Sequence, residues 1–174
     1  YTSSGTATIT STISSQKITN TTTVSKKTSG TMITSLFVQM TSSVTSNTVS
    51  QWVKAGITDV YVQARGSTND TTLLKKTIKL CKGTNIRVHA WIICFKMENG
   101  FDISTKQQTM IKNFVKTVVK ISGISGVCLD YVRYDGTNPD SVKPSVITNF
   151  VKNVNSIVKG YNKKLVMSAT VVAE

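Results

Sequence analysis

Residues 126–134 read GVCLDYVRY, in which a short apolar run follows Gly126 and leads to a single acidic residue, Asp130. A short apolar run of this kind is typical of a strand buried in a parallel sheet. Apolar residues recur with the helical period before it, in residues 110–119, and after it, in residues 146–158. A strand between two helices indicates an alternating β/α fold.

The same alternation extends over residues 31–174. Two further amphipathic patterns predict helices around residues 49–53 and 73–81. Ser104 with Gln107 predicts a helix start, and Pro144 suits a first helical turn. The five predicted strands are 33–40, 57–65, 86–94, 126–131 and 165–171. A glycine follows each helical pattern and predicts a C-terminal cap, at Gly56, Gly83, Gly123 and Gly160.

Strands separated by helices must pair in parallel. Both an open doubly wound sheet and a (β/α)8 barrel satisfy this constraint. No glycine-rich phosphate loop follows the first strand, which favours the barrel. A complete barrel takes about 250 residues. The fold class predicted for residues 31–174 is therefore α/β, with parallel β/α repeats forming part of a TIM-type barrel, apparently truncated after the fifth strand. A longer chain or a partner would supply the rest.

Residues 1–30 are dominated by Ser and Thr and predict a linker or stalk. No apolar run approaches the roughly 18 residues of a membrane span. The start at Tyr1 rather than Met is consistent with removal of an upstream signal or domain. Only 17% of the residues are charged, and Ser, Thr and Asn supply much of the polarity. We therefore expect a secreted or cell-surface protein.

The formal net charge is +13, which attracts anionic partners. The lysines of residues 75–82 and 112–120 lie on the polar sides of helical patterns, as on a solvated outer face or one that adheres to an anionic glycan. A nucleic-acid module drawn by the positive charge is a further alternative, but no motif of interleaved aromatic and basic residues supports it. The expected partner is a polysaccharide or an anionic cell envelope.

The three cysteines, Cys81, Cys94 and Cys128, have none of the spacings of a zinc or redox motif. We expect buried free thiols. With a single histidine in the chain, neither a metal site nor another cofactor is expected.

Successive strand residues point to opposite faces of a sheet. One register of the five strands is almost entirely apolar and should face the helices; it includes Tyr131. The other register should point into the barrel, with its polar groups toward the carboxyl ends, where barrel active sites lie. It contains Ser35, Phe37, Gln39, Tyr61, Gln63, Arg65, His89, Trp91, Cys128, Asp130, Ser168 and Thr170.

Asp130 is the centre of this second register. A carboxylate at the end of a buried strand is costly to desolvate unless it is paired or used. Arg65 and Arg133 are its candidate partners, and a structural ion pair is the alternative to a catalytic carboxylate.

The segments Val88–Ile92 (VHAWI) and Gly126–Tyr134 (GVCLDYVRY) resemble the third and fourth strands of glycoside-hydrolase-like barrels of prokaryotic surface proteins. The ending Met167–Val171 resembles their fifth strand. The resemblance implies a catalytic role for Asp130 and pocket positions for His89, Trp91 and Arg133. Ser125 departs from the family pattern, which has Asp there, and Asp135-Gly136 replaces its usual proline.

Glycoside hydrolysis normally needs two carboxyl groups. Glu174 follows the fifth strand and is the first candidate for the acid, and Asp135 is the second. Glu98, Asp102 and a group from missing strands remain open. Asp59 should lie at the far end of the barrel. The predicted substrate-binding residues are Tyr61, Gln63, Arg65, His89, Trp91, Arg133, Tyr134 and Asp135.

The predicted function is thus a glycosidase that acts on a surface or cell-wall polysaccharide. The alternative is a non-catalytic carbohydrate-binding or adhesin barrel. A cysteine hydrolase using Cys128 and His89 is a weaker hypothesis, because Cys128 falls in mid-strand. His89 itself is more typical of a hydrogen-bonded barrel residue than of a proton shuttle.

Overall fold

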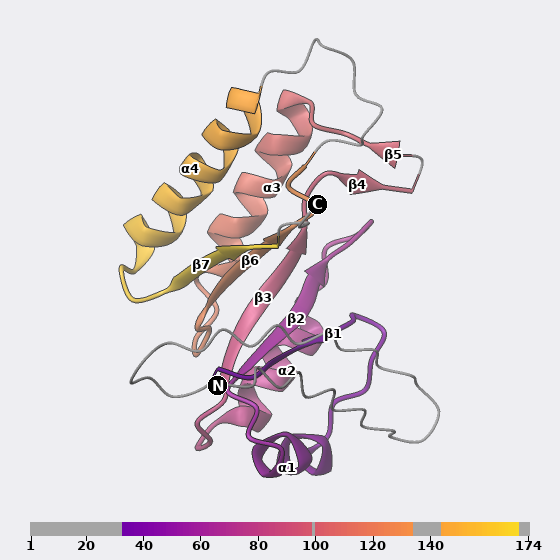
Figure 1. Cartoon of the computed structure of the whole chain (residues 1–174), viewed down its shortest axis with the longest axis vertical. Coiled ribbons are helices and arrows are strands. Elements are labelled where there is room, and N and C mark those ends of the chain that lie inside the picture. Colours follow the sequence, from indigo (N-terminus) through magenta and orange to yellow (C-terminus); the bar gives the residue numbers. More distant parts are fainter. Residues whose placement is uncertain (1–32, 99, 134–143, 171–174) are drawn as a thin grey trace, which may run out of the picture.

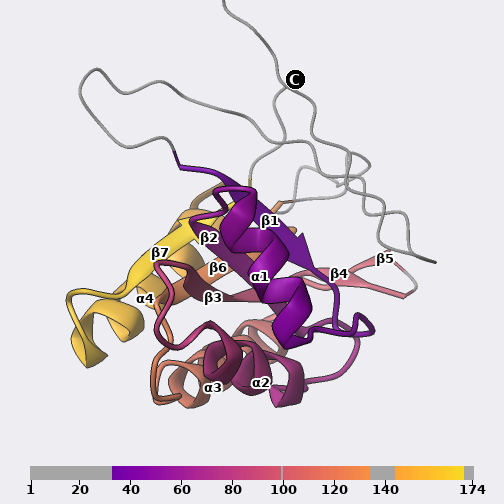
Figure 2. The same cartoon turned by 90° about the horizontal axis from the view of Figure 1, so that it is seen from below.

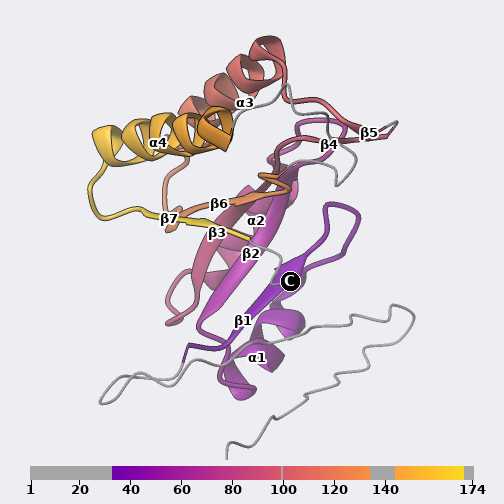
Figure 3. The ribbon, with the colours of Figure 1, turned by 45° about the horizontal axis from the view of Figure 1, so that its top comes forward.

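The structure is a computed structural model that describes residues 33–98, 100–133 and 144–170. Its centre is a five-stranded, wholly parallel sheet with strand order β1-β2-β3-β6-β7 (Figures 1 and 3). The strands are β1 (Ser35–Val38), β2 (Asp59–Arg65), β3 (Arg87–Ile93), β6 (Gly126–Asp130) and β7 (Val166–Ala169). Strands of this sheet that follow one another along the chain are also neighbours in space, as in a (β/α) barrel.

Four helices connect these strands and gather on one side of the sheet (Figure 2). They are α1 (Ser46–Lys54), α2 (Thr72–Cys81), α3 (Thr105–Val118) and α4 (Pro144–Tyr161). A short antiparallel hairpin of β4 (Lys96–Met97) and β5 (Gly100–Phe101) precedes α3. None of the helices in these ranges is long and apolar enough to span a bilayer. The predicted fold, part of a TIM-type barrel, is confirmed.

The core forms between the apolar register of the strands and the helices. Val60, Val62, Ala90 and Ile92 are completely buried there. They pack in one cluster with helix residues that include Trp52, Leu74, Ile111, Phe114, Phe150 and Val154. Burial of this area is the main favourable contribution to the stability of the domain.

The helix boundaries agree in part with the predicted signals. Ser104 accepts a hydrogen bond from the Gln107 N–H, and α4 begins at Pro144, both as predicted. Gly56, Gly83 and Gly123 adopt positive φ angles after their helices. The prediction for Gly160 is wrong, because α4 continues through it to Tyr161.

The strands are shorter than the predicted segments, and two departures affect the candidate site. The register between β2 and β3 shifts between Gln63 and Arg65, so strict alternation on β2 stops at Gln63. Alternation beyond Gln63 therefore no longer supports the assignment of Arg65 to the inward register. Strand β6 ends at Asp130, and Tyr131 has a φ of 53°. Tyr131 thus does not continue the helix-facing register, contrary to the prediction.

Gly126 is the tightest glycine of the sheet. A Cβ atom added to it would lie 2.2 Å from the Val166 carbonyl oxygen and 2.8 Å from His89 Nδ1. Only a residue without a side chain allows β6 to pass between β3 and β7 at this point.

We predict that Gly126→Ala lowers the free energy of unfolding by about 1–3 kcal/mol, the usual cost of overpacking a core. Gly160→Ala is the control, because Gly160 lies in a helix with no atom within 4 Å of an added Cβ. Alanine there should raise stability by about 0.5–1 kcal/mol. Urea titration measures both changes, and equal effects would contradict the packing argument.

Candidate functional site

The sheet face opposite the helices carries most of the polar register and is called the polar face here. Its described members come from all five strands or directly follow them, and they include Phe37, Tyr61, Gln63, His89, Trp91, Cys128, Asp130, Ser168 and Thr170. Most of these side chains are partly exposed, whereas His89 and Cys128 are buried. The polar face therefore offers functional groups to a ligand without disturbing the core.

Asp130 lies at the carboxyl end of β6 and accepts three hydrogen bonds. Trp91 Nε1–H donates to Oδ2 at 2.8 Å, and the Tyr131 backbone N–H donates to Oδ1 at 2.8 Å. The Thr170 hydroxyl also contacts Oδ1 and donates to it. Both oxygens are therefore engaged by donors from β3, from the end of β6 and from the residue that follows β7. This arrangement fixes the orientation of the Asp130 carboxyl group.

Tyr131 follows Asp130 in a left-handed backbone conformation, with a φ of 53°. A bulky residue rarely adopts this conformation, which costs about 1–3 kcal/mol unless its surroundings impose it. Such strain is concentrated at functional sites. Here the conformation allows the Tyr131 N–H to turn back onto the carboxylate of Asp130.

The predicted ion pairs of Asp130 with Arg65 or Arg133 are not formed. Arg65 is buried at the end of β2 and donates from Nη1 to the carbonyl oxygens of Ile93, at 2.8 Å, and Gly66, at 3.2 Å. Burial lowers its pKa. Arg133 is exposed and lies over the Tyr131 ring, with its guanidinium carbon 5.2 Å from the ring centroid. Asp130 is thus held by neutral donors.

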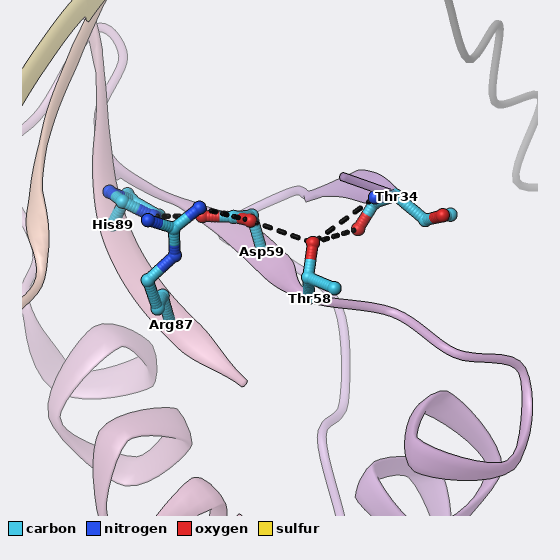
Figure 4. A network of polar contacts seen from close by, with 5 residues as sticks. All are labelled: Thr34, Thr58, Asp59, Arg87 and His89. Atoms are coloured by element: carbon cyan, nitrogen blue, oxygen red, sulfur yellow. Dashed lines mark hydrogen bonds and ion pairs between the residues drawn. The ribbon is translucent and has the colours of Figure 1, made fainter. Parts of the chain in front are cut away.

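A second polar cluster lies at the amino end of the sheet, around Asp59 (Figure 4). Asp59 is 1% exposed and pairs with His89 Nε2 at 2.7 Å and with Arg87 Nη2 at 2.8 Å. The Thr58 hydroxyl also donates to it at 2.8 Å and lies 3.1 Å from the Thr34 carbonyl oxygen. The position of Asp59 at the far end of the strands is as predicted, but its buried pair with His89 was not predicted.

Burial and pairing shift the pKa values of this cluster. Burial opposes ionisation of Asp59, yet the hydrogen bonds from Arg87, Thr58 and His89 outweigh it and lower the pKa of the carboxyl group. Burial lowers the pKa of His89, and the nearby Asp59 offsets that only in part. His89 is therefore neutral near pH 7, and its Nε2–H donates to Asp59. Its Nδ1 is buried without a hydrogen-bond partner.

Aromatic rings line the β1, β2 and β3 part of the polar face. Tyr61 stacks on Phe37 and on His89, with ring centroids 4.8 Å apart in each pair. Trp91 meets Phe37 edge to face at 5.1 Å. Gln63 differs from these neighbours, because its side chain accepts a hydrogen bond from the Met40 N–H. The rings form a continuous apolar surface that leads to Asp130 through Trp91.

All three cysteines are buried free thiols, as predicted. Cys128 is 3% exposed, and burial raises its pKa to about 11. Its partner in a thiol mechanism would be His89, but the Nε2 of His89 is engaged by Asp59. A protonated, inaccessible thiol is a poor nucleophile, which argues against the cysteine-hydrolase hypothesis.

Three predicted site residues, Tyr134, Asp135 and Glu174, lie outside the described residues, as do residues 1–30. The structure therefore places no second carboxyl group opposite Asp130 from these positions. Of the other acidic residues, Asp70 accepts a hydrogen bond from the Thr72 N–H at the start of α2, and Asp102 accepts one from the N–H of Ser104, the N-cap residue of α3. Glu98 is exposed in the β4–β5 turn. Within the described ranges, no cluster of three metal-ligating residues occurs.

Comparison with known proteins gives a likeness of fold. No protein-family model and no curated protein matches the chain. A crystal structure of D-psicose 3-epimerase, determined in the presence of D-fructose, superposes with a TM-score of 0.50 at 14% sequence identity. The match covers 80% of this chain and 52% of the epimerase, so the chain spans about half the length of that barrel.

The buried pair of Asp59 and His89 predicts how stability depends on pH. The pKa of His89 lies below its usual 6.5 in the folded protein, so the unfolded chain takes up the proton first as the pH falls. The free energy of unfolding should therefore fall below about pH 6.5, by up to 1.4 kcal/mol per pH unit. The lowered pKa of Asp59 adds a second loss below about pH 3.8.

His89 is the only histidine of the chain, which makes the test specific. In His89→Gln, an amide N–H can still donate to Asp59, but no group titrates near neutral pH. The free energy of unfolding, measured by chemical denaturation between about pH 6.5 and pH 3.8, should fall with pH in the wild type and change little in the variant. A slope of the same size in both proteins would rule out His89 as its cause.

Proposed function

We propose that this chain is a glycoside-hydrolase-like domain that acts on a polysaccharide, with Asp130 as a reacting carboxylate. The observation that supports it best is the setting of Asp130. The carboxylate is partly exposed at the carboxyl end of a barrel strand, fixed by three donors and followed by a strained backbone. Active sites of (β/α) barrels lie at this end of their strands.

The donors also suggest which of the two glycosidase roles Asp130 would have. A carboxylate whose oxygens both accept hydrogen bonds is an acceptor, ready to act as a nucleophile or a base. A general acid would instead need to keep a proton and donate it to the leaving group. We therefore assign the nucleophile or base role to Asp130, and the acid role to Glu174 or Asp135.

Sugar binding is supported by the aromatic surface beside Asp130. Tyr61 and Trp91 are partly exposed on the polar face and offer flat apolar surfaces to a pyranose ring. The Trp91 N–H meanwhile contacts the carboxylate itself. A ring stacked on Trp91 would thus lie next to the reacting group. The structural neighbour is itself a sugar epimerase with the same type of barrel, which is compatible with a sugar as ligand.

The class of polymer follows from charge. Lys and Arg number 21 against eight Asp and Glu, so the surface attracts polyanions. A surface or cell-wall polysaccharide with acidic groups meets this condition, in keeping with the secreted or surface location that we propose for the chain.

A non-catalytic carbohydrate-binding or adhesin module is the second candidate. It is favoured by one observation: in the described part of the chain, Asp130 is contacted by neutral donors and by no second carboxyl group. Such a module would use the same aromatic rings and would need no acid.

The first test is Asp130→Asn, which keeps the shape of the side chain and removes its charge. If the domain is a glycosidase, release of reducing ends from a panel of wall polysaccharides should fall by about 10²- to 10⁴-fold. Asp70→Asn is the matched control, since Asp70 is exposed and only accepts the Thr72 backbone N–H at the start of α2, and activity should be retained. Undiminished hydrolysis in Asp130→Asn would reject the role; unchanged binding with no hydrolysis in either protein would favour the binding module.

A second variant, Trp91→Phe, separates sugar stacking from control of the carboxylate. Phenylalanine keeps a flat ring but cannot donate to Asp130 Oδ2. Loss of one hydrogen bond to a charged group costs about 1.5–3 kcal/mol, so kcat should fall by roughly ten- to a hundredfold. KM should change little. A rise in KM at constant kcat would instead show that Trp91 serves binding alone.

A further inference from the structure

A cavity of about 420 Å³ lies at the amino end of the sheet, at the opposite end of the strands from Asp130. It is bounded by α2, by the turn from Lys82 to Ile86 before β3, and by Ser122 and Gly123 before β6. Its volume is in the range of small-molecule sites, which is about 300–1,000 Å³. The proposed glycosidase site does not include it.

Three lysines and no acidic residue line this cavity, which is called the lysine cavity here. Lys75, Lys79 and Lys82 are spaced four and three residues apart, so they lie on one side of α2 and its C-terminal end. Like charges at these spacings repel one another. In the described part of the chain, none of the three forms an ion pair with a carboxylate. Asp70, whose pKa is lowered in part by Lys75, lies outside the lining.

The helix dipole accounts for only part of this arrangement. Lys79 in the last turn of α2, and Lys82 just after it, offset the partial negative charge of the helix end. Lys75 lies in the first turn, which contains no acidic residue and where a positive charge is unfavourable. A bound anion would compensate the charges of all three lysines at once.

The floor of the cavity is apolar. Ile86 and Val88, both buried, line it beside Ile78. Gly123, which has a φ of +83°, brings its loop against α2, since an added Cβ would lie 2.8 Å from Ile78 Cγ2. The ligand should therefore combine an anionic group with an apolar flank. Lysine ammonium groups bind phosphate as point charges, and a phosphomonoester carries about −1.5 to −2 charge at pH 7, so it compensates three lysines better than a singly charged carboxylate.

We propose that the lysine cavity binds a phosphorylated sugar or glycerol unit, with the phosphate among the three lysines and the apolar flank against Ile86 and Val88. The unit could be a free phosphomonoester or a repeat of a phosphate-containing polymer. The site would be separate from Asp130 and would not depend on hydrolysis there.

The test is an NMR titration of the ¹⁵N-labelled full chain with glucose 6-phosphate, a glycerol phosphate oligomer, glucuronate or glucose. The two phosphates should shift the amide signals of Gly83, Ser122 and Gly123 in a saturable way. Glucose and glucuronate should have at most weak effects. Tighter binding of the oligomer than of the monoester would indicate a polymer as the source.

The decisive comparison uses two triple variants of equal charge. In the first, Lys75, Lys79 and Lys82 are replaced by Gln. In the control, Lys112, Lys116 and Lys120 of α3 and its C-terminal end are replaced, none of which lines the cavity. The dissociation constant for glucose 6-phosphate should rise by at least about tenfold in the first and less than about twofold in the control.

Equal losses in the two triple variants would overturn the proposal, because they would show a general effect of charge. So would the absence of saturable shifts in the cavity amides. Lys112 is half-buried and the other five lysines are exposed, and a thermal melt of each variant verifies that the fold is kept. If the first triple variant unfolds, Lys75→Gln alone is compared with Lys116→Gln. Both binding measurements are independent of whether Asp130 hydrolyses polysaccharides, so failure of the proposed glycosidase activity would not affect them.

Discussion

Burial of one face of a parallel sheet under a single layer of helices is the constraint on which the rest of this structure depends. Val60, Val62, Ala90 and Ile92 are completely buried on that face, and their neighbours in sequence point the other way. Because the helices take up the apolar face, the opposite face is free to carry polar and aromatic groups. The same pleat that builds the core therefore also assembles the polar face, with Asp130 at its carboxyl end.

Periodicity predicted the number, order and direction of the sheet strands, since each strand has an uninterrupted apolar register. It failed where the backbone leaves ideal geometry. The register shift after Gln63 interrupts the alternation of side chains between the two faces before Arg65. The positive φ of Tyr131 ends this alternation on β6. Neither departure has a signal in the sequence as clear as a glycine or proline. The β4–β5 hairpin was missed because each of its strands has only two residues.

The candidate site was predictable to the level of strand ends, but not of contacts. Asp130 and Trp91 were assigned to one face, yet the hydrogen bond between them depends on how β3 and β6 align. The pair of Asp59 and His89 shows the same limit, because the two residues are 30 positions apart. A signal did exist: Asp59 and His89 fall in one register, near the starts of neighbouring strands. Aligning those starts would have brought them together.

The two ends of the sheet thus differ in what their carboxylates do. Asp59 is buried and fully paired, as expected of a group that stabilises the fold. Asp130 is partly exposed and followed by strained backbone, which is the pattern of a functional group. Its donors are Trp91 on β3, Tyr131 directly after β6 and Thr170 directly after β7, and these three strands are neighbours in the sheet. Further strands of a closed barrel would cover the polar face and add groups to it, whereas the three hydrogen bonds that orient Asp130 are made within the described five-stranded part of the chain.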